Sequence, residues 1–506
     1  MRRETSHSPA ILLLVAALAV SVAMLLPATA IADEPAKGDA AKTVVVESAA
    51  SHVDAANLAT WERLSGPTAL DTMKKIVQKG WTSSDNAVVA SLEGFHDALA
   101  ASSLAGELNA PVLLTPTAYL AQQTADELVR LKVKKVYIVG GVASVSAHAE
   151  EQIRLYGVTT VRVAGKDAQQ TSLEVGKEVA DQGSKTVIVA TSAGYWDALT
   201  SGPYAYATKS PIFLTNGDGT KLLDDIIAQI KKQGANTALI AGGEGSVKPA
   251  VAQQLEDAGL TVNRLAGPNA YGTARVFANH CMQEGMGVKD LAVASGAVHQ
   301  DALCGAALCG KNEAVLLLAD AEHTGDAFDF LRAHNTLVHN AYILGGTASV
   351  SKDAEDLLKM ATRSDAATLQ ARMENAEFFA EHFYSALYLE DPNDDSTIKP
   401  KDLASWKDEC RKYVDPASAM YQRLGENSIY ARDAATLAKN VFVTKVTDTT
   451  VSVHVDAAAT QDMLVGKGWS ANIANRIDLT LTFNSNNLIT AMTSSLGTVA
   501  TSSLSL

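Results

Sequence analysis

A series of short motifs occurs three times along this chain, at intervals of about a hundred residues. Each series begins with an Arg-x-x-Gly element, whose arginines are Arg63, Arg162 and Arg264. An Asp-Ala-Leu element follows each time, with its aspartate at Asp97, Asp197 and Asp301. A period of this length exceeds that of a solenoid unit, so each copy is predicted to be a small domain.

Two further elements complete each series. The first is an apolar triplet: Val112, Leu113 and Leu114, then Ile212, Phe213 and Leu214, then Leu316, Leu317 and Leu318. The second is a glycine pair followed by a Ser-Val element, whose serines are Ser144, Ser246 and Ser349. The triplets are predicted to be buried strands, since sheets covered on both faces give continuous hydrophobic runs. The glycine pair predicts a tight turn, with the serine as the cap of the next helix.

Short apolar runs alternate with helical patterns within each copy. In the first copy the runs are residues 87–90, 112–114 and 136–139, and the helical patterns are 97–108, 120–131 and 147–156. This alternation predicts an α/β domain with a parallel sheet that helices cover on both faces. Residues 159–163 are predicted to be a strand that starts the second copy.

The first 32 residues have the pattern of an export signal. Arg2 and Arg3 precede an apolar run over residues 10–26, and small residues near Ala30 offer a cleavage site. We therefore expect a mature protein outside the cytoplasm, with residues 33–60 as a mobile lead-in. No other apolar stretch is long enough to cross a bilayer, so no integral membrane segment is expected after signal cleavage.

Charge and cysteine content exclude several classes of protein. Acidic residues outnumber basic ones by 56 to 42, which argues against a nucleic-acid partner. The four cysteines are too few for a disulfide scaffold, although one bridge among Cys281, Cys304 and Cys309 is possible. Cys304 and Cys309 lie five residues apart in a predicted helix and should not pair with each other. No metal site is predicted, because no Cys-x-x-Cys or histidine-rich spacing occurs.

The pattern changes near residue 365, where a separate α+β domain is predicted over residues 366–506. Helical patterns come first and alternating strands follow, at residues 366–389, 403–413, 417–424, 441–446, 450–455 and 477–483. In the first helix, four side chains could share an apolar face, namely Phe378, Phe379, Phe383 and Leu387. The order of elements loosely resembles the nuclear transport factor 2-like fold. His382, His454 and Cys410 show no zinc spacing and no nucleophile–base arrangement.

The recurring aspartates allow two interpretations. Each follows a predicted strand and opens a helix, where a carboxylate can cap free amides and complement the helix dipole. Alternatively they line a crevice at the carboxyl ends of the strands, where open α/β sheets bind ligands. A catalytic partner does not recur, because in the second copy Ser192 or Ala193 replaces Glu93 and Trp196 replaces His96. No catalytic residue is therefore predicted.

The glycine turns and arginines raise questions of ligand chemistry. The Gly-x-Gly-x-x-Gly and Gly-Lys-Ser/Thr spacings of nucleotide sites are missing, and no cofactor is predicted. One arginine per copy could bind a phosphate or carboxylate on a polymer. It could equally form an ion pair within or between the copies.

Together these motifs resemble the cell wall binding repeat 2 family. The first copy carries the likeness most fully, at residues 95–100, 110–115, 136–141 and 144–146. The resemblance extends over residues 61–363, as repeats 61–157, 158–260 and 261–363. It implies three tandem Toprim-like repeats in a pseudo-threefold arrangement.

The resemblance also implies a function. The protein would be secreted and held noncovalently on a Gram-positive cell wall by an anionic, teichoic acid-like secondary polymer, while residues 366–506 carry the distinct activity. In the family the apolar triplet is associated with anchoring. The expected polymer-binding residues are the recurring arginines, aspartates and triplets. The alternative is a wall-remodelling enzyme, an amidase or peptidoglycan hydrolase, anchored by the same repeats.

One departure from the family pattern concerns an arginine. Family members often have Arg-Tyr-x-Thr after the first glycine, but Ala69, Ala168 and Ala270 stand at the arginine position here. Residues 61–363 also hold 26 basic and 32 acidic residues, so an anionic ligand would need a local basic groove. The residues considered for such a groove are Lys74, Lys75, Lys166 and Arg275.

Overall fold

The computed structural model describes residues 58–179, 184–384, 408–424, 435–460, 474–494 and 497–498. The predicted export signal and nearly all of the predicted lead-in lie outside these residues. Among the described residues, no helix combines the length and the apolar character needed to cross a membrane.

Each repeat contributes a four-stranded, all-parallel sheet. The first has the order β3-β2-β4-β5, from β2 (Asn86–Ser91), β3 (Val112–Thr115), β4 (Lys135–Val139) and β5 (Thr159–Val163). The second has the order β7-β6-β8-β9, from β6 (Thr186–Ala190), β7 (Ile212–Leu214), β8 (Thr237–Ala241) and β9 (Thr261–Leu265). The third has the order β1-β12-β10-β11, from β1 (Thr60–Leu64), β10 (Asp290–Ala294), β11 (Leu316–Leu318) and β12 (Asn340–Leu344). The predicted α/β class is confirmed.

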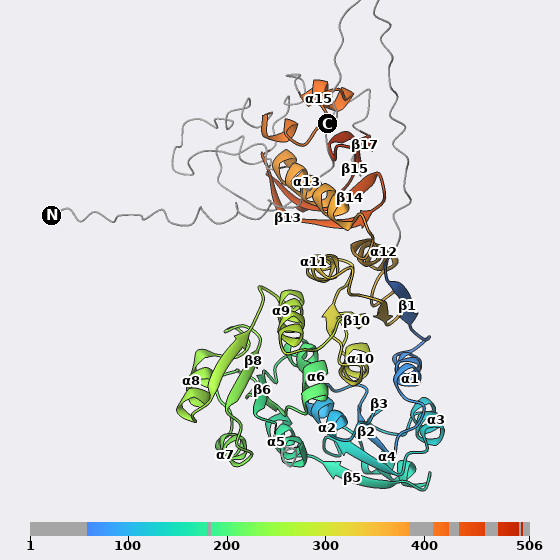
Figure 1. Ribbon diagram of the computed structural model, residues 1–506, viewed down its shortest axis with the longest axis vertical. Coiled ribbons are helices and arrows are strands. Elements are labelled where there is room, and N and C mark those ends of the chain that lie inside the picture. Colours follow the sequence, from blue (N-terminus) through green and yellow to red (C-terminus); the bar gives the residue numbers. More distant parts are fainter. Residues whose placement is uncertain are drawn as a thin grey trace, which may run out of the picture. The chain divides into compact units, whose positions relative to one another are not determined.

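Helices connect these strands in the order expected for βαβ units (Figure 1). Around the first sheet they are α1 (Ala69–Gly80), η1 (Ala98–Ala100), α2 (Ala101–Glu107), α3 (Gln122–Leu131) and α4 (Ala147–Arg154). Around the second they are α5 (Ala168–Val179), α6 (Trp196–Thr208), α7 (Asp224–Lys232) and α8 (Pro249–Asp257). Around the third they are α9 (Ala270–Gln283), α10 (Gln300–Lys311), α11 (Gly325–Ala333) and α12 (Lys352–Ala361).

The strand that carries the arginine motif belongs to the sheet of the preceding repeat. Arg162 in β5 lies opposite Ile138, and Arg264 in β9 lies opposite Ile240. Residues 159–163 form the predicted strand, but this strand completes the first sheet and does not start the sheet of the second repeat. The third sheet receives its arginine strand from the other end of the repeat region, because Arg63 of β1 lies opposite Ile343. β1 thus closes the three repeats into a ring.

Three helices meet where the repeats join. The Asp-Ala-Leu elements stand at the starts of α6, of α10 and of η1, which runs directly into α2. Ser102, Gly202 and Ala306 hold the same position relative to these elements. A Cβ atom on Gly202 would lie 2.7 Å from Ala306 Cβ and 3.0 Å from Ser102 Oγ. Small side chains therefore allow the helices to approach closely, and the three repeats adopt the predicted pseudo-threefold arrangement.

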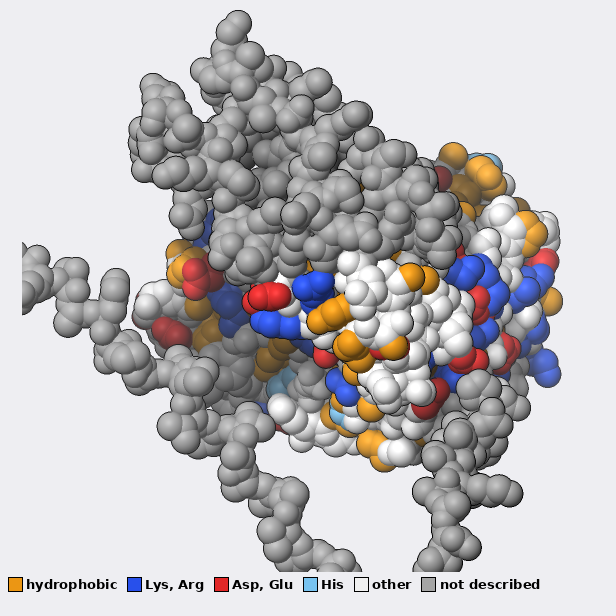
Figure 2. Space-filling model, turned by 90° about the horizontal axis from the view of Figure 1, so that it is seen from above, with side chains coloured by type: hydrophobic (Ala, Val, Ile, Leu, Met, Phe, Trp, Pro, Cys, Tyr) orange, Lys and Arg blue, Asp and Glu red, His pale blue; other side chains and the backbone are white. Residues whose placement is uncertain are grey.

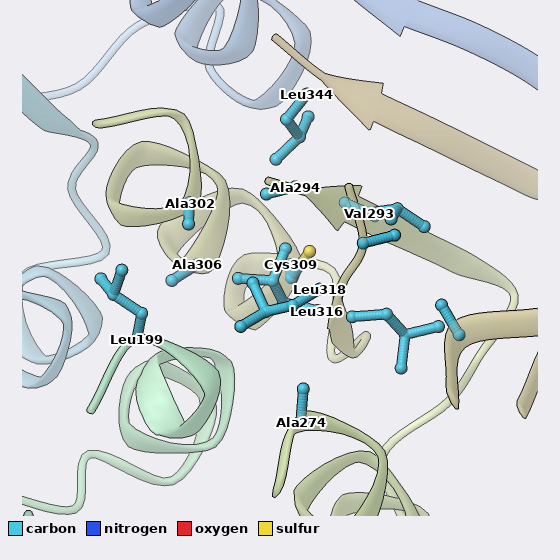
Figure 3. Close-up of a cluster of buried hydrophobic side chains, with 14 of the residues drawn as sticks. Leu199, Ala274, Val293, Ala294, Ala302, Ala306, Cys309, Leu316, Leu318 and Leu344 are labelled. Carbon is cyan, nitrogen blue, oxygen red and sulfur yellow. The ribbon is translucent and has the colours of Figure 1, made fainter. Parts of the chain in front are cut away.

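The apolar triplets lie in the core. Figure 3 shows Leu316 and Leu318 of β11 in one cluster with Cys309 of α10 and Ala274 of α9. All nine triplet side chains are 1% exposed or less, so the prediction of buried strands is confirmed.

All four cysteines are free and buried. Burial raises the pKa of the Cys281, Cys309 and Cys410 thiols to about 12 and also raises that of Cys304. Because the thiolate is the reactive form, a maleimide reagent at pH 7 is expected to leave the native protein unlabelled. The chain unfolded in guanidinium should take up four labels, as mass spectrometry would show. Rapid labelling of the native protein at any of these cysteines would contradict this packing.

Beyond residue 365 the chain forms the predicted α+β domain. Its antiparallel sheet has the order β13-β14-β15-β16-β17, and its strands are β13 (Ala435–Val446), β14 (Thr450–Thr460), β15 (Ala474–Phe483), β16 (Ile489–Ser494) and β17 (Gly497–Thr498). Its named helices are α13 (Ala366–Tyr384) and α15 (Ala419–Leu424). α13 packs on the sheet, and the Val443 amide donates to Glu377 Oε1 at 3.2 Å.

The predicted apolar face of α13 is only partly correct. Phe379 is buried and stacks on Phe383 with ring centroids 5.4 Å apart, but Phe378 is 49% exposed. Leu387 lies outside the described residues, as do residues 403–407 of the predicted helix 403–413, whereas residues 408–411 of that segment are helical.

Candidate binding site at the carboxyl ends of the strands

The recurring aspartates bind the recurring serines. The Ser144 hydroxyl donates to Asp97 Oδ2 at 2.5 Å, and hydrogen bonds from Ser246 and Ser349 reach Asp197 and Asp301. Neither partner makes the capping hydrogen bond that the sequence suggested: the aspartates lie at the helix starts without one. The serines that do cap α4 and α12 stand two residues further on, at Ser146 and Ser351. Each aspartate–serine pair instead joins the loops after two neighbouring strands.

The first glycine of each pair makes room for the aspartate. Gly140, Gly242 and Gly345 have φ values of 113°, 104° and 102°, a region that disfavours other residues. A Cβ atom at these positions would lie 2.8, 2.2 and 2.3 Å from Oδ2 of the aspartate in the same repeat. The tight turn predicted from the glycine pairs is confirmed, and close approach of a carboxylate is a second reason for glycine.

Burial changes the ionisation of two of these aspartates. It raises the pKa of Asp197, against hydrogen bonds from Ser246 and Thr273 that lower it. Burial raises the pKa of Asp301 to about 6, against a hydrogen bond from Ser349. Asp301 Oδ1 is buried and has no hydrogen-bond partner in the described part of the chain.

Two of the recurring arginines form partly buried ion pairs. Arg162 Nη2 lies 2.7 Å from Glu150 Oε2, and its Nη1 donates to the Gly140 carbonyl at 2.8 Å. Arg63 likewise lies 2.5 Å from Glu355 and donates to the Gly345 carbonyl at 2.8 Å. Each arginine lies on the edge strand next to the strand that ends in the glycine turn. Its side chain therefore fixes this turn to the edge strand.

Arg264 keeps only part of this arrangement. It donates to the Gly242 carbonyl at 2.8 Å, but Ala252 stands where the other repeats have glutamate. Within the described ranges, no carboxylate lies within ion-pair distance of Arg264. The ion-pair interpretation therefore holds for Arg63 and Arg162. Sequence reasoning missed Glu150 and Glu355, although their shared position and its loss at Ala252 would have revealed them.

The other expected polymer-binding residues are differently placed. The nine triplet side chains are shielded from solvent, so in this structure they shape the repeats without facing a polymer. Lys74 lies 2.9 Å from Asp126, and Arg275 lies 3.0 Å from Asp326, so neighbouring carboxylates offset both charges. Lys75 and Lys166 are exposed. Figure 2 shows basic and acidic side chains next to one another on the face it displays.

An aromatic triangle surrounds the pseudo-threefold axis. Phe95, Tyr195 and His299 each stand two residues before the recurring aspartate. Their ring centroids lie 5.2, 5.7 and 5.6 Å apart, so each ring contacts the other two. The sequence analysis missed this triangle, because the three residue types differ while their position is constant.

The loops at the carboxyl ends of the strands in repeat 2 surround a cavity. It has a volume of about 200 Å³ and is lined by Thr191, Ala193, Gly194, Trp196, Asp197, Gly217, Asp218, Gly245 and Ser246. Asp197 therefore lines a crevice at the carboxyl ends of the strands, as the second interpretation of the aspartates predicts.

In repeat 1, Glu93 takes the place of Ala193. Glu93 Oε2 accepts from the Thr117 amide at 3.0 Å and from the Ser91 hydroxyl at 3.2 Å, which bridges the two loops. In repeat 3, the Tyr271 hydroxyl binds Asp320, and its ring stacks on His323 at 4.4 Å. A side chain thus bridges the two loops in repeat 1, whereas in repeat 3 the contacts join α9 to the loop after β11.

The fold and these loops define a ring of three α/β binding repeats that is joined to an α+β domain. The chain belongs to the cell wall binding domain 2 (CWB2) family, whose pattern matches residues 63–150, 162–252 and 264–355. These segments make up slightly more than half of the chain, and they indicate a cell wall-binding protein.

Two curated relatives come from Bacillus subtilis. The N-acetylmuramoyl-L-alanine amidase LytC is 30% identical over 300 residues, which is 59% of this chain and 58% of the relative. A protein named amidase enhancer is 28% identical over 303 residues, which is 60% of this chain and 40% of the relative. The chain therefore spans less than two thirds of either protein.

Two solved structures from Clostridium difficile share the fold. Cwp8 matches with a TM-score of 0.54 and 27% identity over 60% of this chain and 51% of its own. Cwp6 matches with a TM-score of 0.53 and 25% identity over 60% of this chain and 48% of its own. None of these matches supports the expected likeness of residues 366–506 to the nuclear transport factor 2-like fold.

Proposed function

We propose that this protein is secreted and held noncovalently on a Gram-positive cell wall through its three repeats. The ligand in this proposal is an anionic, teichoic acid-like secondary wall polymer. The family match in all three repeats carries the proposal. The α+β domain is then the part presented outside the wall.

The ring of repeats suits attachment to a polymer. Each sheet places its aspartate–serine pair and glycine turn at the carboxyl ends of its strands, so one chain offers three related surfaces. When several weak sites bind one polymer, the later contacts become intramolecular and attachment lasts longer than any single contact.

A sedimentation experiment tests this proposal. The chain from residue 33 onward, which keeps β1, is mixed with purified Gram-positive walls before and after their acidic polymers are extracted. We expect the protein to sediment with the intact walls and to stay in solution with the extracted ones. Equal sedimentation with both preparations, or none with either, would contradict it.

The likeness to an amidase supports a second candidate, a wall-remodelling enzyme. Its catalytic centre would have to lie in the α+β domain. Burial raises the pKa of the Cys410 thiol there to about 12, and His454 Nδ1 lies 2.7 Å from Asp478. No group of three or more metal-ligating side chains occurs in the parts of the chain that the structure describes.

Because the family match in the repeats indicates wall binding, we place a non-catalytic role first. Zymography of the full chain on peptidoglycan separates the two candidates, because a clear band would favour the enzyme.

A further inference from the structure

We propose that the open cavity of repeat 2 binds a neutral, hydroxyl-rich sugar ring of the wall polymer. The inference rests on the proposed function and names the chemical group recognised at one site. Its occupant fits between Trp196 on one side and the loops after β7 and β8 on the other.

Trp196 supplies an exposed aromatic ring in a fixed orientation. The side chain is 41% exposed, and its indole nitrogen donates to the Gly296 carbonyl at 2.6 Å. Gly194 lies against the same ring, since a Cβ atom there would be 2.8 Å from it. A ring that is held in this way and still reaches solvent can stack on the apolar face of a sugar at little cost in side-chain entropy.

The polar lining favours hydroxyl groups over phosphate. Asp197 and Asp218 line the cavity, and no lysine or arginine is among its lining residues. Carboxylate oxygens accept hydrogen bonds from hydroxyl groups, whereas they repel a phosphate. The negative groups of an anionic polymer would therefore lie outside this cavity.

Glycines keep the cavity open. At Gly217 a Cβ atom would meet nothing within 4 Å, and the same holds at Gly245. Ala143 and Ala348 occupy the place of Gly245 in the other repeats. A volume of about 200 Å³ holds about six or seven water molecules, which suits one sugar ring.

Two variants test the proposal. Trp196→Ala removes the stacking surface, and Ala193→Glu introduces the side chain that bridges the loops in repeat 1. Tyr119→Ala is the matched control, because Tyr119 is 52% exposed and lies away from the cavity lining. Thermal unfolding of each protein first checks that the fold is intact.

Wall sedimentation gives the first readout. We expect both cavity variants to bind walls roughly fivefold to tenfold more weakly than the wild type, a loss of about 1 to 1.4 kcal/mol. The control should bind like the wild type. If the wild type sediments and both cavity variants match it, the inference is overturned while the proposed function stands. If the wild type does not sediment at all, the proposed function fails, and the inference fails with it.

Competition identifies the chemistry. The neutral sugar fraction from hydrolysed walls is expected to displace the wild type from walls, and inorganic phosphate at the same ionic strength is not. Displacement by phosphate alone would overturn the assignment of a neutral sugar.

Discussion

Replacing Arg63 by alanine is expected to lower the free energy of unfolding of the repeats by about 2–4 kcal/mol. The Arg63 side chain is 16% exposed and that of Glu355 is 10% exposed, so the variant takes one of two ion-pair partners from a largely buried carboxylate and leaves it with Lys359. The same guanidinium donates to the carbonyls of Gly345 and Val350, which join β1 to the third repeat. Urea unfolding at pH 7, followed by circular dichroism, measures the loss.

Arg264→Ala is the matched control, because this arginine has the equivalent carbonyl contact without the glutamate. Its expected loss is about 1 kcal/mol, the usual value of one hydrogen bond. Equal losses for the two variants would show that the ion pair contributes nothing.

Acid should reduce the difference between wild type and Arg63→Ala. Burial raises the pKa of Glu355, but hydrogen bonds from Lys359 and Arg63 outweigh it, so the pKa lies below its usual value of 4.5. A carboxyl group whose pKa is lower in the folded protein stabilises the fold at pH values above its unfolded-state pKa. This contribution is lost as the pH falls through the folded-state pKa.

Asp301→Asn is expected to stabilise the protein at pH 7.5, by as much as about 3 kcal/mol. The pKa of Asp301 is about 6 in the folded protein and 3.8 in its ordinary state, so the folded state holds the proton more tightly. Stability is therefore highest at low pH and falls as the pH rises from 3.8 to about 6. Asparagine stays neutral throughout, and its carbonyl oxygen can still accept from Ser349.

Urea unfolding at pH 7.5 and near pH 4 measures this effect. The gain should be present at pH 7.5 and largely absent near pH 4, where the carboxyl group of the wild type is itself protonated. Asp218→Asn, at an exposed position, is the control and should change stability by less than about 0.5 kcal/mol at either pH. A variant that is less stable than wild type at pH 7.5 would show that the charged form is favoured.

The repeated motifs predicted much of the fold, because residues close in sequence form the strands and turns. Residues 136–139 were expected as a strand, and β4 covers Lys135–Val139. The glycine turns were predicted for the same reason, since a turn depends mainly on its own residues.

Pairing between distant segments was not predictable in this way. No strand was predicted from the sequence at β1, whose partner strand lies some 280 residues further along the chain. The arginine motif also begins each series in the sequence, although its strand completes the preceding sheet.

The candidate site was less accessible to sequence reasoning than the fold. Ser144 stands before a helix and was read as its cap, yet the cap is Ser146 and the Ser144 hydroxyl binds Asp97. A serine before a helix gives the same sequence pattern in both roles. The position of the loop after β2, which carries Asp97, decides between them. The cavity near Trp196 likewise depends on what is missing, because Ala193 lacks the side chain that Glu93 supplies in repeat 1.

The pairing of β1 with β12 also constrains the order in which the chain can fold. The first sheet has all its strands once residue 163 is available, and the second once residue 265 is available. The third must bring its first strand, Thr60–Leu64, to Asn340–Leu344, so its contacts have the largest sequence separation in the repeat region. Contacts of this kind form slowly, because a long loop must close before they are made. Until then β12 presents an unpaired edge, and completion of the third sheet is expected to be the last and slowest step in folding of the repeats.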